Sequence, residues 1–199
     1  MNHPRLATTI LLLVTCACAS PPGTAESLRT VTGFRAVRKA GDLDAARAFL
    51  SDDPRVWYGE REGAGSPWRL GGGRWKAWDE HFNSTSEELS VEATEREVSI
   101  VFLENNDYYR LTERGPSPVR LTWFLDAAGR IEGYLVSSVK RDGPSTSRYD
   151  EFEAWAQEHA PGELEYLVPN GSIDPTGDRA PRFRALLERW RRAAGLPTL

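Results

Sequence analysis

Two alternating apolar runs joined by a turn, in residues 119–139, constrain this chain more than any other feature. In the first run, apolar side chains such as Val119, Leu121 and Trp123 alternate with more polar ones, which is the period of a β-strand. Gly129 lies in the connection, where a short hairpin needs a residue that tolerates positive φ. The pattern predicts a β-hairpin within a curved sheet that holds its large residues over a cavity.

The same two-residue period precedes the hairpin. Residues 89–94, 98–103 and 108–112 each alternate between apolar and polar side chains, which predicts further strands. Asn105 and Asn106 lie between the last two runs and are typical of a tight turn. We therefore expect a four- or five-strand antiparallel meander.

Helical periodicity dominates the segment before the meander. Apolar residues recur with helical spacing in 26–39, 43–50 and 74–83, which predicts three amphipathic helices. A glycine-rich loop is expected over 60–73, and we expect its Trp68 to pack against the folded protein.

The composition changes after residue 139. A polar linker is followed by two helical patterns, in 147–161 and 178–195, and these predict an appended helical pair. The second pattern is rich in arginine. It is either a patch for anionic lipid headgroups or nucleic acid, or a face that is solvated or pairs with acids of its own domain such as Glu151 and Glu153.

The first 18 residues have the layout of a secretory signal followed by a lipidation site. A short basic head precedes an aliphatic run at 10–14 that is too short to span a membrane. Cys16 and Cys18, the only cysteines of the chain, each fit a bacterial lipobox imperfectly, and a plain secreted protein cleaved near Ala17 or Ala19 is the alternative. We predict an exported lipoprotein, anchored to a bacterial membrane of the cell envelope.

The remaining composition excludes several classes of function. With both cysteines in the leader, the folded part has no disulfide scaffold, cysteine nucleophile or thiolate metal site. Removing residues 1–17 removes one arginine and no acid, so the net charge changes from −4 to −5, which argues against nucleic acid as a partner. His81 and His159 are too few for a histidine metal site, and no phosphate-binding or dinucleotide motif is present. We expect neither a metal nor a cofactor.

The order of these elements resembles the nuclear-transport-factor-2-like superfamily, which includes the SnoaL-like polyketide cyclases and the ketosteroid isomerases. The resemblance rests on N-terminal helices, a short strand, a Trp-bearing helix and a meander containing Asp-x-x-Gly-Arg-Ile from Asp126 to Ile131, and it covers roughly residues 27–140. It implies an α+β cone, in which a curved antiparallel sheet and the N-terminal helices enclose a pocket.

This resemblance divides the chain into four parts. Residues 1–17 are expected to be the signal peptide, 18–26 a flexible tether, 27–140 the cone and 141–199 a C-terminal helical extension.

Candidate catalytic residues follow from the isomerases, in which an inward aspartate acts as base beside an oxyanion-stabilising tyrosine. Glu60 follows the predicted short strand 55–58, and Asp107 and Glu104 flank the Asn-Asn turn. A turn is usually wet, which leaves a carboxylate near its ordinary pKa, so ordinary loop and turn acids are the competing interpretation. His81, three residues after a tryptophan of the third helix, either borders the cavity or is a structural histidine.

Eight aromatic residues are candidates for the wall of an apolar pocket, where tyrosine and tryptophan also offer a hydrogen-bonding group. The alternative for each is simple core packing. They are Trp57, Tyr58, Trp75, Trp78, Phe102, Tyr109, Trp123 and Tyr134.

Three functions remain open on these grounds. The preferred one is a membrane-anchored domain that binds a small, largely apolar or aromatic molecule without catalysis. The first alternative is a SnoaL-like enzyme doing acid–base chemistry with Glu60, Asp107 and a pocket tyrosine. The second is a protein–protein module, including a homodimer, that pairs through the outward sheet face at Arg120, Thr122 and Phe124.

Overall fold

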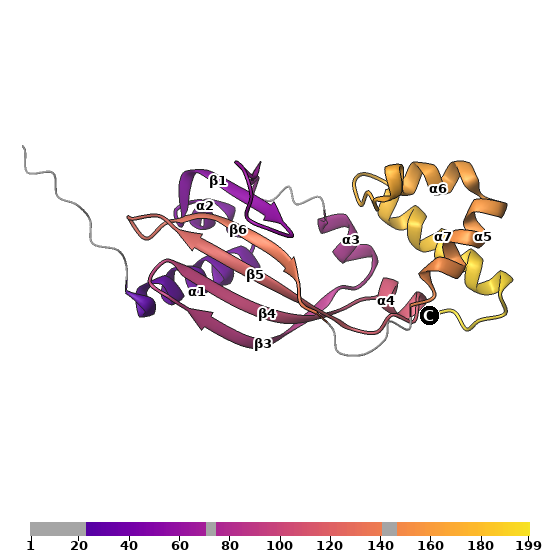
Figure 1. Cartoon of the computed structure of the whole chain (residues 1–199), viewed down its shortest axis with the longest axis horizontal. Helices are drawn as coiled ribbons and strands as arrows, with labels where there is room; N and C mark the ends of the chain where they lie inside the picture. The colour runs from indigo at the N-terminus through magenta and orange to yellow at the C-terminus, as the bar shows by residue number, and fades with distance from the viewer. Residues whose placement is uncertain (1–22, 71–74, 141–146) are drawn as a thin grey trace, which may run out of the picture.

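The computed structural model describes residues 23–70, 75–140 and 147–199. The expected signal peptide and the lipobox cysteines lie outside the described residues. The protein is an elongated α+β structure in which a curved sheet is flanked by α1 and α2 near one end and by a group of helices at the other (Figure 1). This arrangement confirms the predicted fold class, including the C-terminal helical extension.

The sheet contains six strands in the order β2-β1-β6-β5-β4-β3. Their bounds are β1 Leu50–Tyr58, β2 Ser66–Pro67, β3 Thr85–Ala93, β4 Glu97–Asn105, β5 Ser117–Leu125 and β6 Ile131–Ser138. Strands β3 to β6 form the predicted antiparallel meander, whereas β1 pairs with β6 in parallel. The β5–β6 hairpin that the alternation predicted is present, and Gly129 adopts a φ of +76° in its turn.

Two N-terminal helices cover the concave face of this sheet. Helix α1 (Thr24–Lys39) contacts β3 and β4, and α2 (Leu43–Arg47) packs beside α1. Val31 and Phe34 of α1 are buried against sheet residues that include Ile100 and Trp123. The Ser27 hydroxyl donates to the Thr94 carbonyl over 2.5 Å, which ties the first turn of α1 to the β3–β4 turn.

One predicted strand is a helix. Residues 108–112 were expected to extend the meander, but they lie in or directly after α4 (Asp107–Leu111). Asn106 caps this helix, because its side-chain oxygen accepts the Tyr109 backbone N–H at 2.9 Å. Asparagine is a strong N-cap residue, so the Asn-Asn pair starts a helix here and does not form a hairpin turn.

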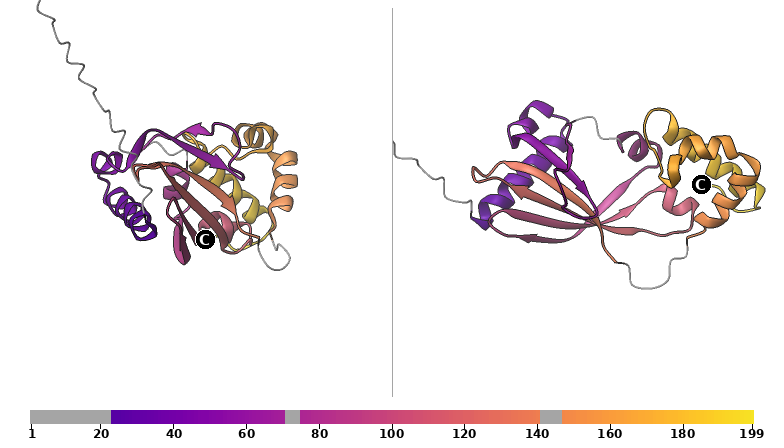
Figure 2. Two further views of the ribbon diagram at one scale, coloured as in Figure 1. Left: turned by 60° about the vertical axis from the view of Figure 1, so that its left-hand side comes forward. Right: turned by 45° about the horizontal axis from the view of Figure 1, so that its top comes forward.

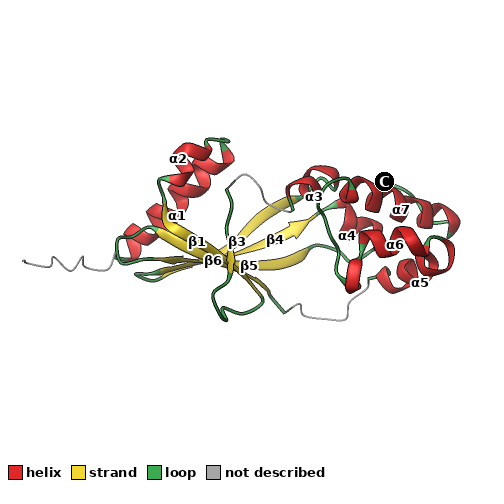
Figure 3. Cartoon of the chain, turned by 90° about the horizontal axis from the view of Figure 1, so that it is seen from above, coloured by secondary structure: helices red, strands yellow, loops and turns green. Residues whose placement is uncertain are grey.

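Five helices build a second core at the far end of the sheet (Figures 2 and 3). They are α3 (Lys76–His81), α4, α5 (Tyr149–His159), α6 (Pro161–Leu167) and α7 (Arg179–Ala193), with a short 3-10 turn, η1 (Pro169–Gly171). The expected helical pair is thus three α-helices in the described part of the extension. Trp78 and Phe82, stacked with ring centroids 4.1 Å apart, belong to this core together with Phe152, Phe183 and Trp190.

A buried carboxylate joins the meander to the helical extension. Asp107 of α4, 3% exposed, accepts hydrogen bonds from Arg184 of α7 at 2.5 Å and from Asn83 at 2.6 Å, and also pairs with Arg110. Burial alone would raise the pKa of Asp107, but these hydrogen bonds outweigh it and hold the pKa below its usual value.

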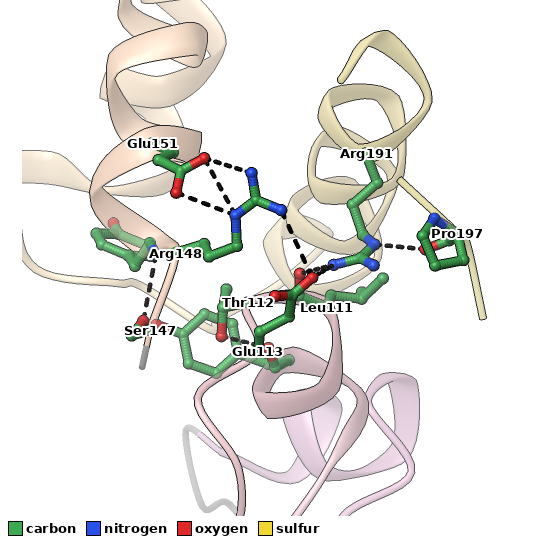
Figure 4. A network of polar contacts seen from close by, with 10 residues as sticks. Leu111, Thr112, Glu113, Ser147, Arg148, Glu151, Arg191 and Pro197 are labelled. Carbon is green, nitrogen blue, oxygen red and sulfur yellow. Dashed lines mark hydrogen bonds and ion pairs between the residues drawn. The ribbon is translucent and has the colours of Figure 1, made fainter. Parts of the chain in front are cut away.

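A second polar network anchors the end of the chain (Figure 4). The Arg191 guanidinium donates to the Leu111 carbonyl at 2.7 Å and to the Pro197 carbonyl at 2.6 Å. Arg148, at the start of α5, pairs with Glu113 at 3.6 Å, and Glu113 also pairs with Arg191 at 3.3 Å. The C-terminal helices are therefore fixed to both ends of α4.

Gly133 of β6 provides a test of the parallel β1–β6 pairing. A Cβ at this position would lie 2.3 Å from the Arg55 carbonyl and 2.7 Å from the Trp57 ring, whereas a Cβ at Gly162 in α6 meets nothing within 4 Å. We expect Gly133→Ala to lower the free energy of unfolding by about 3 kcal/mol through overpacking. Gly162→Ala should leave it unchanged or raise it slightly, because alanine favours helix. Urea unfolding measures both, and equal effects of the two variants would contradict the pairing.

Asp107 provides a test of the junction. Since its folded pKa lies below the ordinary value, the stability it supplies is present above about pH 4 and is lost as the pH falls through the lower folded pKa. We expect Asp107→Asn to lower the free energy of unfolding by about 2 kcal/mol at pH 7, and this deficit should shrink toward pH 3. The matched control is Asp44→Asn, whose carboxylate is 95% exposed, and it should leave unfolding unchanged. A deficit for Asp107→Asn that is constant with pH would contradict the assignment.

Candidate functional site

One row of side chains on the concave face leads from a packed end to a partly open end. Along β4, Val98 and Ile100 are buried, Phe102 is half-buried and Glu104 ends the row. Strand pairing places Leu121 of β5 beside Ile100. The concave face is therefore apolar over most of its length and ends at a carboxylate.

Aromatic side chains fill the packed end. Trp68 lies edge-on to Phe34 with ring centroids 5.4 Å apart and edge-on to Tyr134 at 4.7 Å. Trp123 beneath them is 4% exposed. The expectation that the loop tryptophan packs against the folded protein is confirmed, and it closes part of the hollow that the sheet curvature creates.

Glu104 lies at the open end, held by residues from the start of α4. The Tyr109 hydroxyl donates to one carboxylate oxygen at 3.3 Å, and the Asn106 side-chain amide donates to the other at 3.3 Å. Both residues are buried, so the two donors are fixed by the fold. Of the two interpretations of Glu104, the wet turn acid is wrong, because α4 folds back over the end of the strand and partly buries this side chain.

A second carboxylate, Asp79 of α3, acts on the same group. Desolvation raises the pKa of Glu104, the negative charge of Asp79 raises it further, and the hydrogen bonds from Tyr109 and Asn106 partly oppose them. Desolvation by neighbouring atoms also raises the pKa of Asp79, although this side chain is exposed, and the charge of Arg38 of α1 partly opposes the rise. Burial and the neighbouring Glu104 raise the pKa of Tyr109 to about 12.

These groups can bind and move protons. The Glu104 carboxyl group, whose ionisation burial and the charge of Asp79 disfavour, lies beside the hydroxyl of Tyr109 at the end of an apolar surface. The Glu104 carboxyl group and the Tyr109 hydroxyl can therefore form hydrogen bonds with a polar group of a largely apolar molecule.

The eight aromatic candidates divide among four places. Phe102, Trp123 and Tyr134 lie on the concave face, and Tyr58, at the end of β1, is 54% exposed. Trp57 lies on the opposite face, where it packs against Phe124 at 5.8 Å. Trp75, Trp78 and Tyr109 belong to the helical end, where Trp78 and Tyr109 are part of the second core and Trp75 contacts Trp78 at 5.7 Å. The structure thus does not bring all eight around one hollow.

Apart from Glu104, the three remaining catalytic candidates do not come together either. Glu60 is exposed in the loop after β1, and His81 is exposed at the end of α3, where its backbone carbonyl accepts a hydrogen bond from Arg184. Asp107, expected at a wet turn, is buried and joins two parts of the fold through its ion pairs. The assignment of a catalytic role to these three has no support in their positions.

The convex face is partly covered by the chain itself. Phe124, expected to face outward for a partner, is 5% exposed because Trp57 packs on it and the Arg61 guanidinium lies 3.7 Å from its ring centroid. Arg120 is exposed, and Thr122 contacts Ser99 through their hydroxyls at 3.0 Å. The predicted interaction face therefore lacks its aromatic residue.

The arginine-rich helix α7 is largely neutralised. Arg182 pairs with Asp178, Arg184 with Asp107 and Glu188, and Arg189 with Glu163. The sequence left open whether these arginines form a patch for anionic partners or pair with acids of the same chain. These three pair with acids of the same chain, although the partners are not the expected Glu151 and Glu153.

Other classes of site receive no support from the described residues. Among them, no group of three or more His, Cys, Asp and Glu side chains is placed to hold a metal ion. None of the helices described is both long and apolar enough to cross a bilayer.

A recess of about 320 Å³ lies between α5 and α6, lined by residues that include Glu153, Leu164 and Glu165.

Sequence reasoning missed Asp79 and undervalued Glu104. The alternation Val98, Ile100, Phe102 continues in phase to Glu104, so the strand pattern itself indicates an inward carboxylate. No comparable signal exists for Asp79, because the position of α3 depends on its packing against the C-terminal helices.

A titration tests the coupled group. We expect the Glu104 carboxyl carbon, followed by NMR, to titrate with a midpoint above its ordinary value of 4.5. Asp79→Asn should move the midpoint down, since a neighbouring negative charge is removed, and Tyr109→Phe should move it up, since a hydrogen bond to the carboxylate is lost. Shifts of the same sign in both variants would contradict the proposed coupling, and Glu60→Gln serves as a distant control.

The comparisons with known proteins concern the fold. No protein-family model matches this chain, and none of the curated proteins does. Solved structures are similar to it, among them a SnoaL-like protein of unknown function from Burkholderia thailandensis, with 13% identity and a TM-score of 0.41 over 61% of this chain and 100% of that one.

Two further structures are similar over about the same share. One is a Mycobacterium tuberculosis protein in complex with estradiol-17beta-hemisuccinate, with 14% identity and a TM-score of 0.40 over 56% of this chain and 92% of that one. The other is an NTF2-like protein of unknown function from Cytophaga hutchinsonii, with 14% identity and a TM-score of 0.37 over 57% and 89%. Each corresponds to slightly more than half of this chain.

Proposed function

We propose that this chain is an NTF2-like, SnoaL-like lipoprotein whose concave sheet face binds a small, largely apolar molecule at the end marked by Glu104, without catalysis. The observation that carries this proposal is the concave row itself. Half-buried Phe102 precedes a carboxyl group held by Tyr109 and Asn106, so an apolar surface ends in fixed hydrogen-bonding groups. Small-molecule sites in proteins have this composition, mostly apolar with a few placed polar groups.

The packed end limits the size of the ligand. Phe34, Trp68 and Tyr134 occupy the hollow over Trp123, so the ligand is placed toward Phe102 and Glu104, which are both half-buried. The Arg35 guanidinium lies 5.0 Å from the Phe102 ring centroid and borders this part of the face. A ligand there would place its apolar body near Phe102 and a hydroxyl or carbonyl group near Glu104. The Glu104 carboxyl group offers it an acceptor, and the Tyr109 hydroxyl, which donates to that carboxyl group, lies beside it.

A second candidate is an acid–base enzyme on the same surface. The raised pKa values of Glu104 and Asp79 favour it, because a carboxyl group tuned upward by desolvation is suited to proton transfer. In this function Glu104 is the base and Tyr109 the oxyanion donor, in place of the expected Glu60 and Asp107. The two functions differ in the fate of the ligand: a binding protein releases it unchanged, whereas an enzyme releases a product.

Anchoring through a lipidated Cys18, or Cys16, to a bacterial membrane is the second part of the proposal. Only five residues, all of them small ones or prolines, separate Cys18 from Thr24, where α1 begins. Several acyl chains on one cysteine hold a protein firmly at a bilayer surface.

An apolar dye tests the binding surface. We expect N-phenyl-1-naphthylamine, an uncharged fluorescent probe, to bind the purified domain, and Phe102→Asp to weaken its Kd at least about tenfold, since an aromatic contact contributes about 1.5–3 kcal/mol. The matched control is Leu103→Asp, the next residue of β4 on the opposite face, which should bind normally. Glu104→Gln should also retain the probe. Equal loss in both β4 variants would contradict a site on the concave face.

Mass spectrometry tests the anchor. We expect the protein from a bacterial host to begin at Cys18, or at Cys16, and to carry acyl chains on that cysteine. An unmodified Ala19 or an intact Met1 at the N-terminus would rule lipidation out. Cys18→Ser and Cys16→Ser distinguish the two positions, because only one of them should abolish the added mass.

A further inference from the structure

A lipid anchor at the N-terminus would place the start of α1 next to the bilayer. We propose that the anchored protein stands on its α1 end, so that the helical extension and the Glu104 site are held away from the membrane. This inference rests on the proposed lipidation of Cys18 and adds an orientation to it. The end concerned, here named the α1 end, comprises the start of α1, the β3–β4 turn at 94–96 and the β5–β6 turn at 126–130.

Contacts hold these three segments together. The Ser27 hydroxyl of α1 donates to the Thr94 carbonyl, and the Leu125 backbone N–H donates to the Arg96 carbonyl at 2.9 Å. The start of α1 is therefore bonded to the β3–β4 turn, and that turn is bonded to the end of β5. In Figures 1 and 3 this end of the sheet lies opposite the helices α5 to α7.

The tether is short compared with the sheet. From Cys18 to Gly23, where the described structure begins, there are five residue steps, which span at most about 18 Å when fully extended. Strand β4 runs from the α1 end to α4 over nine residues, or about 30 Å. Glu104 and the helical extension thus lie farther from the anchor point than the tether can reach.

The surface charges of β3 and α7 do not favour an orientation in which the long side of the protein lies on an anionic bilayer. The edge strand β3 exposes Glu87 and Glu92, which anionic headgroups repel, while its Glu88 pairs with Arg35. In α7, Arg182, Arg184 and Arg189 pair with acids of the chain, so this basic sequence offers little attraction to headgroups. The mature net charge of −5 acts in the same direction.

The orientation has a consequence for ligand exchange. Glu104 lies at the α4 end of β4, which in this orientation is the end away from the membrane. A ligand of the proposed site at Glu104 is then supplied from the aqueous compartment and not directly from the lipid phase. The helical extension is the part of the protein presented to other molecules of that compartment.

Single cysteines test the orientation, because the chain has no cysteine after Cys18. Ala128→Cys lies in the exposed β5–β6 turn and Glu165→Cys lies exposed on α6. Each lipidated full-length variant is labelled with a donor fluorophore and reconstituted into vesicles of phosphatidylethanolamine and phosphatidylglycerol that carry an acceptor-labelled lipid. We expect energy transfer at least about twofold more efficient from position 128 than from position 165, given the separation along the sheet.

Two controls separate the possible failures. The parent protein without an added cysteine measures background labelling, and a long Gly-Ser insert after Pro22 should lower transfer from position 128 by lengthening the tether. Protein that does not float with vesicles overturns both the anchor and the orientation. Protein that floats but transfers equally from both positions, or better from position 165, overturns the orientation alone.

Discussion

The alternation of side chains along β4 and β5 is the constraint on which the rest of the structure depends. It sends one row of residues to the concave face and the next row to the convex face, and any shift by one residue would exchange the two. Val98, Ile100 and Phe102 therefore face α1, and Leu121 and Trp123 of β5 extend the same surface. The hollow, the core beneath α1 and the inward carboxylate Glu104 all follow from this register.

The second core depends on a helix that interrupts the meander. Because α4 lies between β4 and β5, the sheet ends in a helix whose faces are apolar on one side and polar on the other. Tyr108 and Leu111 are buried among the C-terminal helices, while Asp107 pairs with Arg184. The same short helix thus joins the extension to the sheet and presents Tyr109 to Glu104, so the stability of the junction and the geometry of the candidate site are linked.

Opposing interactions act on the ionisation of Glu104 at the α4 end of the concave face. Glu104 receives two hydrogen bonds that favour its charged form, while desolvation and Asp79 favour its neutral form. The balance leaves its pKa above the ordinary value. Binding and acid–base chemistry use the same residues, and they differ in whether the ligand presents a hydrogen-bonding group or a removable proton to the carboxyl group.

The sequence by itself determined the helix–meander order, the β5–β6 hairpin and the inward phase that ends at Glu104, because periodicity is local and is visible in one strand or helix at a time. Tertiary structure decided the rest. It made residues 107–111 a helix, moved Trp78 and Tyr109 into the second core, turned Trp57 to the convex face and brought Asp79 near Glu104. Each of these outcomes depends on which side of an element finds a partner far away in the chain, and a local pattern of side chains carries no information about that partner.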